Sequence, residues 1–233
     1  MRLTKYAHSC VRIQGDGVLV IDPGSLSERE ALDGVDAVLI THEHFDHLDV
    51  DALTDAVAKR PSIAIYTHPD VISKLTDLAD VVHPVVTGEE FIAAGFTVRT
   101  FGGLHAVVHP DLPPVANLGF HVAGQGGSGG VYHPGDSFDV PSGVEVETLF
   151  VPVSGPFLKL ADAIDFVRAV GPRRAFALHD GLHNDIGNQV SDHFLTELSR
   201  SDYVRLPTRA TVDLAEQGVP IPETVSPDRN EDS

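Results

Sequence analysis

The stretch THEHFDH, residues 41–47, places three histidines and one aspartate within six residues. It follows segment 36–40, whose apolar run predicts a fully buried strand. Imidazole nitrogens and carboxylate oxygens are preferred ligands of Zn²⁺ and related ions, and a strand end can hold several such side chains around one point. A polar surface loop whose histidines share no role is the alternative. Whether the rest of the chain supplies further metal ligands decides between a metal site and a surface loop.

Four further side chains suited to metal sites lie where predicted strands end, namely Asp22, His105, Asp136 and His179. Glycine or proline lies close to each, which lets the chain turn sharply. Together with the 41–47 stretch they allow two metal ions to be held. One ion takes His42, His44 and His105, the other takes Asp46, His47 and His179, and Asp136 bridges them. Asp22 is expected to orient a ligand imidazole through its other ring N–H.

The remaining histidines are weaker candidates for metal ligands. His109 lies four residues after His105 and competes with it, but the Gly102-Gly103 turn favours His105. His133 is expected to be a strand residue that faces away from the metals. His8 and His183 are candidates for the pocket, with a structural role as the alternative. The others are expected to be structural or surface residues: His68, His83, His121 and His193.

The hydrophobic pattern predicts two sheets packed against each other with helices outside them. A β-hairpin is expected from 6–13 and Val18–Ile21. Helices are expected at 49–58, Leu160–Val170 and 189–200, with a shorter one after Pro69. Further strands are predicted at 62–66, 79–86, 91–101, 117–122, 146–153, Arg174–Leu178, 203–206 and 210–214. Segment 124–130 holds five glycines in seven residues and predicts a hairpin turn.

Residues 1–215 are expected to form a single domain, followed by an acidic, proline-containing tail at 216–233 that is loosely ordered. Across 233 residues, 34 acidic side chains outnumber 16 basic ones, and the formal net charge is −18. This charge disfavours nucleic acids and anionic membranes as partners. No apolar stretch approaches the ~20 residues of a membrane span, and no secretory leader follows Met1. The single cysteine, Cys10, is expected to be a buried strand residue and fits a cytoplasmic protein.

Taken together, Asp22, the 42–47 cluster, His105, Gly135-Asp136 and His179 resemble the motifs of the metallo-β-lactamase superfamily, in the same order. The resemblance extends from Ala7 to about Leu214 and implies an α/β fold, a four-layer αββα sandwich with a dinuclear site between its sheets. More narrowly, three segments resemble a branch of uncharacterised metal-dependent hydrolases and ascorbate-6-phosphate lactonase-like proteins. These segments are His8-Ser9, 152–156 and 177–181.

The resemblance implies a metal-dependent hydrolase with two divalent ions, with Zn favoured and Mn or Fe as alternatives. A metal-bridged hydroxide would attack a small-molecule ester, lactone or phosphoester. Asp46 is the candidate catalytic residue that holds and deprotonates the water. The proton donor to the leaving group, or a substrate contact, is left open between His8, His183 and water. Loops 110–116 and 181–187 are expected to set specificity.

Three other functions remain as alternatives. A nuclease or phosphodiesterase of the same superfamily is disfavoured by the negative charge. A redox di-iron protein is disfavoured because such members carry Glu where this chain has His44. A non-catalytic metal-binding or regulatory protein would keep the fold without turnover. The sequence leaves homo-oligomer formation open.

Overall fold

The computed structural model describes residues 1–124 and 129–215, which fold into two seven-stranded sheets. The first sheet has the order β14-β1-β2-β3-β4-β5-β6 and the second β13-β12-β11-β10-β9-β8-β7. The first comprises β14 (Thr211–Asp213), β1 (Arg2–Lys5), β2 (Val11–Gln14), β3 (Val18–Ile21), β4 (Ala37–Ile40), β5 (Ala64–Thr67) and β6 (Val82–Pro84). The second comprises β13 (Asp202–Val204), β12 (Arg174–Leu178), β11 (Val146–Pro152), β10 (Gly130–His133), β9 (Ala116–Gly124), β8 (Phe96–Leu104) and β7 (Glu90–Ala93).

Alternating side chains of the central strands build three cores, one between the sheets and one outside each sheet. In β3, Leu19 and Ile21 point between the sheets, where they join Phe120 and Phe150 of the second sheet. Val20 lies on the opposite face of β3 and packs in the core under the first helix. Successive side chains of a strand point to opposite faces, so a run that is apolar throughout predicts a strand covered on both sides.

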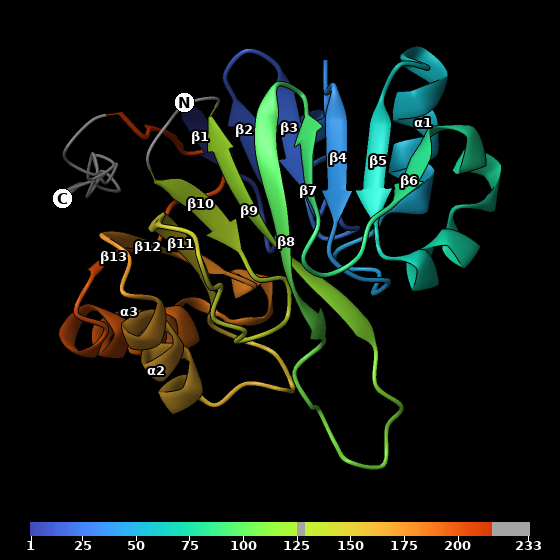
Figure 1. The fold of residues 1–233 in the computed structure, drawn as a ribbon. Coiled ribbons are helices and arrows are strands. Elements are labelled where there is room, and N and C mark those ends of the chain that lie inside the picture. Colours follow the sequence, from blue (N-terminus) through green and yellow to red (C-terminus); the bar gives the residue numbers. More distant parts are fainter. Residues whose placement is uncertain (125–128, 216–233) are drawn as a thin grey trace, which may run out of the picture.

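Helices cover the outer face of each sheet (Figure 1). Helix α1 (Val50–Lys59) packs outside the first sheet, and its N-cap Asp49 accepts a hydrogen bond from Ala52 N at 2.9 Å. Helices α2 (Leu160–Val170) and α3 (Asp185–Leu198) lie outside the second sheet (Figure 1). This arrangement confirms the expected four-layer αββα sandwich. Within the described residues, no helix has the length and apolar character needed to cross a membrane.

The expected first strand of the first hairpin, residues 6–13, is wrong. Strand β2 covers only Val11–Gln14, and an additional strand, β1, lies at Arg2–Lys5. Residues 6–10 form a tight turn instead, closed by the bond from Tyr6 N to Cys10 O at 2.9 Å. The buried Lys5 amino group shapes this turn by donating to the carbonyls of Tyr6 and His8. Cys10 is buried as expected, but it precedes the strand.

Other boundaries also differ from the expectation. Segment 91–101 is a hairpin of β7 and β8, because the chain reverses at Ala94 and Gly95, both with positive φ. Segment 79–86 contributes only the short strand β6. The chain between β5 and β6 forms the 3-10 helices η2 (Pro69–Lys74) and η3 (Thr76–Val81). Helix α3 begins at Asp185 because Asn184 caps it by accepting from Gly187 N at 2.9 Å.

Two expectations cannot be compared with the structure. The glycine-rich turn at 124–130 lies largely outside the described residues, although the flanking strands β9 and β10 pair antiparallel. The tail at 216–233 also lies outside them.

Candidate metal centre

The carboxyl ends of parallel strands bring the candidate ligands to one edge of the sandwich. Strands β3 and β4 run parallel in the first sheet, as do β10, β11 and β12 in the second. Asp22 follows β3, the 42–47 cluster follows β4, Asp136 follows β10 and His179 follows β12. His105 arrives from β8. Because parallel strands end on the same side, ligands distant in sequence become neighbours.

The structure gathers these side chains into two groups, each with its ligand atoms within 4.8 Å of one another. One group contains His42, His44, His105 and Asp136. The other contains His8, Asp46, His47 and His179. Apart from His8, these are the seven residues that the sequence nominates as ligands.

Asp136 lies between the groups and contacts both. Its Oδ2 atom is 3.3 Å from His105 Nε2 and 3.1 Å from His179 Nε2. Its Oδ1 atom is 3.2 Å from His47 Nε2. The backbone holds the carboxylate in place, because Asp136 N donates to Asn117 Oδ1 at 3.0 Å.

Asp22 orients one imidazole in each ligand group, that of His47 directly and that of His42 through Thr41. Its carboxylate accepts from Thr41 N at 2.8 Å, from Thr41 Oγ1 at 2.7 Å and from His47 Nδ1 at 2.7 Å. Since the Thr41 hydroxyl hydrogen is used on Asp22, its oxygen accepts from His42 Nδ1 at 2.9 Å. Both histidines therefore carry a proton on Nδ1 and direct Nε2 at the site, the arrangement that metal-ligating histidines adopt.

His105 is oriented in the same way by its own chain. Its Nδ1 atom donates to the carbonyl of Ala106 at 2.6 Å, so that Nε2 points to Asp136. His44 completes this group, with Nδ1 at 3.0 Å from His42 Nε2. Phe157 forms an apolar wall beside the centre, with its ring 5.1 Å from that of His105 and 5.6 Å from that of His179, centroid to centroid.

Unpaired buried atoms face the same space. Asp136 Oδ1 and both ring nitrogens of His179 are buried and form no hydrogen bond with the described residues. His179 is also held in the left-handed region, at φ 57°, as is Asp22 at φ 50°. Such conformations are costly for residues other than glycine and concentrate at functional sites. Buried polar atoms that lack a hydrogen-bond partner, beside residues held in costly backbone conformations, fit a site built for cations.

The electrostatics also favour a cation. Burial alone lowers the pKa of His47, but Asp136 and Asp22 on either side raise it well above its usual value. Burial raises the pKa of Asp136, yet His47, His105 and His179 hold it well below its usual range. Burial and the neighbouring His47 lower the pKa of His42, which keeps it neutral. An ionised, buried carboxylate needs a positive charge beside it, and a neutral imidazole offers a lone pair to a metal.

His8 has a tautomer unlike that of a ligand. Its Nδ1 atom accepts from Gly181 N at 3.2 Å, so Nε2 carries the proton and donates to Asp46 Oδ2 at 3.0 Å. This side chain is buried, and its backbone lies in the left-handed region at φ 60°. The structure thus places His8 against Asp46, with its N–H directed at the carboxylate.

The other singled-out histidines lie elsewhere. His183 belongs to neither group, and its ring lies over Gly187 at the start of α3. His109 is exposed beside Asp111, away from both groups. His133 is a strand residue, as expected, but it lies beneath the centre, with Nε2 2.9 Å from Ser9 O and 4.0 Å from Asp22 Oδ2.

Sequence reasoning missed Thr41 and Phe157. Thr41 directly precedes the first histidine and is the one hydroxyl residue of the stretch, a signal that could have nominated it as a partner of Asp22. No pattern in the sequence marks Phe157.

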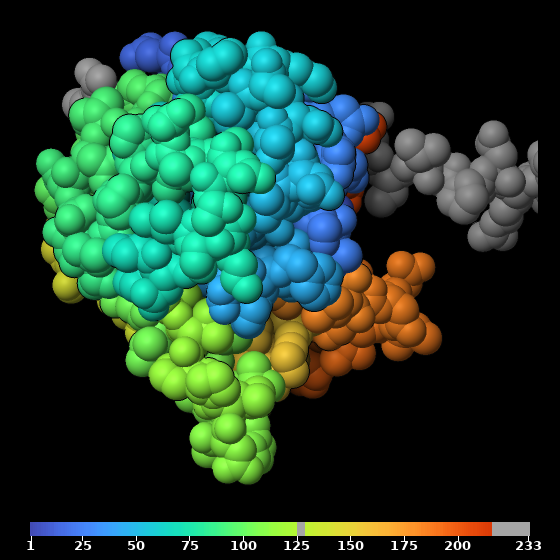
Figure 2. Space-filling model, turned by 90° about the vertical axis from the view of Figure 1, so that its right-hand side faces the viewer, coloured from blue at the N-terminus to red at the C-terminus, as the bar shows by residue number. Residues whose placement is uncertain are grey.

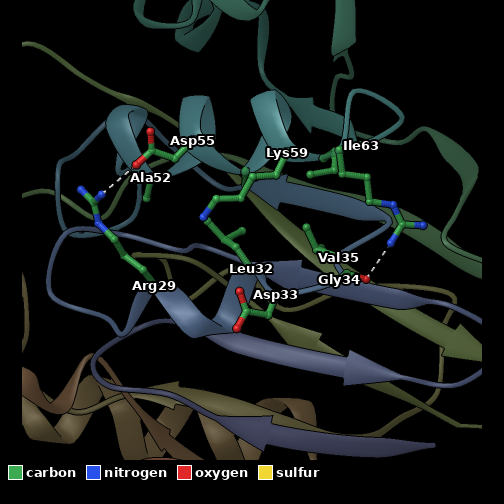
Figure 3. A pocket seen from close by; sticks show the side chains of 11 residues that line it. Arg29, Leu32, Asp33, Gly34, Val35, Ala52, Asp55, Lys59 and Ile63 are labelled. Atoms are coloured by element: carbon green, nitrogen blue, oxygen red, sulfur yellow. Dashed lines mark hydrogen bonds and ion pairs between the residues drawn. The ribbon is translucent and has the colours of Figure 1, made fainter.

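A cavity of about 370 Å³ opens beside the centre, with His44 and His105 in its wall. Another cavity, of about 110 Å³, lies between α1 and the 3-10 helix η1 (Arg29–Leu32), and Figure 3 shows Arg29 and Lys59 at its edge. Arg29 is paired there with Asp55 at 3.2 Å. Because none of the nominated ligands lines this second cavity, only the first concerns the centre.

Comparisons with known proteins identify the family of the chain. A family model described as the Beta-lactamase superfamily domain matches residues 2–179. The chain is 35% identical over 214 residues to Protein Rv0786c of Mycobacterium tuberculosis, covering 91% of this chain and 99% of the relative. It is 28% identical over 211 residues to a UPF0173 metal-dependent hydrolase of Aeropyrum pernix, covering 77% and 82%.

Among solved structures, the metallo hydrolase Igni18 of Ignicoccus hospitalis matches with a TM-score of 0.71 at 19% identity, over 91% of this chain and 97% of that one. That likeness concerns the fold alone. The family model spans most of the chain and ends at His179, the last of the nominated ligands. The chain therefore belongs to the β-lactamase superfamily and has the metallo-β-lactamase fold.

Proposed function

We propose that this protein is a metal-dependent hydrolase that uses a dinuclear centre on a small-molecule ester, lactone or phosphoester. The observation that carries the proposal is the position of Asp136, whose two carboxylate oxygens face His47 of one ligand group and His105 of the other. A shared carboxylate between two sets of imidazoles is the arrangement that a pair of bridged ions requires. The name of the Aeropyrum pernix relative, a metal-dependent hydrolase, supports the same class.

Five histidines and two aspartates would hold the ions: His42, His44, His105, His47, His179, Asp46 and Asp136. Nitrogen and oxygen ligands of this kind suit Zn²⁺, with Mn and Fe as alternatives. When bound, such ions lower the pKa of a coordinated water and polarise the oxygen of the bond under attack. The chain contributes ligand orientation through Asp22, Thr41 and Ala106 O.

Asp46 is the residue proposed to hold and deprotonate the attacking water. Burial raises the pKa of its carboxyl, but the neighbouring His179 imidazole and the hydrogen bond from His8 hold it well below the usual range, so it is an ionised acceptor. His8 donates to Oδ2 at 3.0 Å and limits rotation of the carboxylate. A general base held in one orientation raises the reaction rate, because the carboxylate and the attacking water are already positioned for proton transfer.

Protonation of the leaving group stays with His8, His183 or water as candidates. His8 already directs its proton at Asp46 Oδ2. His183 lies against Gly187 at the border of the loop expected to set specificity. Water that enters from the open side of the centre is the third source.

A nuclease is the less favoured alternative. The formal net charge of −18 repels a phosphate backbone. None of the described residues that line the cavity beside His44 is a Lys or an Arg. A phosphodiester chain would therefore find no cationic side chain in this cavity.

Metal analysis combined with a substrate panel tests the proposal. Protein loaded with Zn²⁺ should contain two ions per chain and cleave at least one of a lactone, a carboxylic ester and a phosphodiester. Asp136→Ala and His44→Ala should lose metal and activity yet stay folded, whereas the exposed His109→Ala should keep its metal content. Two ions retained in Asp136→Ala would refute the ligand assignment. A fully loaded protein that cleaves nothing would favour the non-catalytic alternative.

A further inference from the structure

An apolar arm overhangs the open side of the metal centre. It consists of residues 105–115, between β8 and β9, and projects from the body of the molecule in both views (Figures 1 and 2). Val107 is 72% exposed and Leu112 56%, and Leu104 at the base of the arm is 59% exposed. Large apolar side chains gathered in this way usually mark a binding surface.

The arm is stiff and tied to the centre. Pro110, Pro113 and Pro114 restrict its backbone. At its base, His105 N donates to Val115 O at 2.9 Å, and Ala106 N donates to Asp136 O at 2.7 Å. The arm is thus anchored to the residue that contacts both ligand groups.

The cavity beneath the arm has one polar end. Its volume is about 370 Å³, within the range of small-molecule sites. His44 and His105 form the end at the metal centre, while the rest of the wall is made almost entirely of Ala, Val, Leu and Pro side chains, with His109 at the rim. Among the described residues, no Lys, Arg, Asp or Glu lines it.

We propose that the substrate is a neutral ester or lactone with an aliphatic acyl chain, which lies along the arm while its carbonyl faces the ligand groups. This inference rests on the proposed hydrolase function and specifies its substrate. An apolar wall stabilises a chain by removing its methylenes from water. A charged group on the substrate away from the reacting bond would lie in the apolar part of the cavity, where none of the described lining residues is a Lys or an Arg.

The reaction is a plain hydrolysis. An oxygen–carbon bond forms between water and the acyl carbon, and the bond from that carbon to the ester oxygen breaks. One proton from water passes to the departing alcohol oxygen, which gives a carboxylic acid and an alcohol, or one hydroxy acid from a lactone. No oxidant or other co-reactant is needed.

A series of p-nitrophenyl esters from acetate to octanoate, given to the Zn²⁺-loaded protein, tests the inference. A fully buried methylene favours binding by roughly fourfold, so kcat/KM should rise by at least about tenfold from acetate to octanoate in a half-open cavity. The double variant Val107→Ser/Leu112→Ser should lower the octanoate value about tenfold, through KM, and leave acetate within about twofold. Ile92→Ser is the matched control, since Ile92 is 55% exposed on β7, outside the cavity.

A binding measurement separates this inference from the hydrolase proposal. By NMR titration, 1-octanol should bind the chelator-treated protein and the Ile92→Ser variant alike, and bind the double variant about tenfold more weakly. Octanol binding without cleavage of any ester, lactone or phosphodiester would keep the apolar site and refute the hydrolase. If the rate of ester cleavage does not depend on chain length and octanol does not bind, the substrate inference is wrong while the hydrolase proposal stands.

The arm could instead join two copies of the chain, and the same variants decide this. In that case the double variant would change the molar mass measured by light scattering and would reduce acetate and octanoate turnover equally. Either result would overturn the substrate inference.

Discussion

Replacing Asp22 by Asn should weaken metal binding although the substitution changes no ligand. Asp22 accepts three hydrogen bonds, two from Thr41 and one from His47 Nδ1 at 2.7 Å. An asparagine can keep its oxygen on Thr41 N, but its amide NH₂ then meets the N–H of His47. To relieve the clash, the His47 proton must move to Nε2, which is the atom directed at the metal centre.

The size of the effect follows from the bond that is lost. A hydrogen bond to a charged group is worth about 1.5–3 kcal/mol. Loss of a partner behind a metal-ligating histidine typically costs about 10–100-fold in metal affinity, or about 1.4–2.8 kcal/mol. The two ranges agree. The ion held by His47 should be weakened most, and the ion held by His42 should also be affected because Thr41 links His42 to Asp22.

Competition with a fluorescent zinc chelator measures the affinities of the two ions separately. The matched control is Asp36→Asn, because Asp36 also accepts a backbone N–H, from Val18 at 2.8 Å, and pairs with Arg60, but it lies in neither ligand group. This control should lose some thermal stability and keep its metal affinity. If Asp22→Asn binds both ions as tightly as the unaltered protein, the assignment of tautomers through Asp22 is wrong.

Three further predictions concern the surroundings of the centre. His8→Ala should lower kcat about 10–100-fold and keep both ions, because His8 presents an N–H to Asp46; loss of an ion by mass spectrometry would instead make His8 a ligand. Lys5→Met should cost about 3 kcal/mol in urea unfolding, since it removes the buried donor to the carbonyls of Tyr6 and His8; an unchanged midpoint would contradict this. Metal affinity should fall as pH falls, by about tenfold per pH unit for each displaced proton, because the raised pKa of His47 lets protons compete. Equal affinities at about pH 6 and about pH 8 would refute that competition.

The sequence by itself nominated the candidate ligands and determined the layered fold. The 42–47 cluster is contiguous, so its chemistry is visible without any tertiary contact. Apolar runs such as Ala37–Ile40 predict strands that are buried on both faces. Such a strand needs a second sheet on one face and a helix on the other to keep its side chains from water. Helices α1 and α2 were predicted to within one residue because their periodicity and caps are local signals.

Elements without a local signal were missed. The turn at residues 6–10 depends on Lys5, whose amino group reaches Asp180, 175 positions along the chain. The hairpin of β7 and β8 was predicted as one strand because Ala94-Gly95 interrupts a segment of strand-forming residues by only two positions. In both cases the conformation is decided by a partner or a turn geometry that propensity does not encode.

Tertiary structure alone decided how the histidines are used. His105 and His109 are equally suited as ligands by residue type, and the Gly102-Gly103 turn only favours His105, whereas the structure places His105 beside Asp136 and His109 away from it. The tautomers of His42, His47 and His8 depend on Thr41, Asp22 and Gly181, so those partners fix which ring nitrogen faces the proposed metal centre. The physical reason is that a ligand's identity is a property of the residue, whereas the direction of its lone pair is a property of the neighbours that folding brings to it.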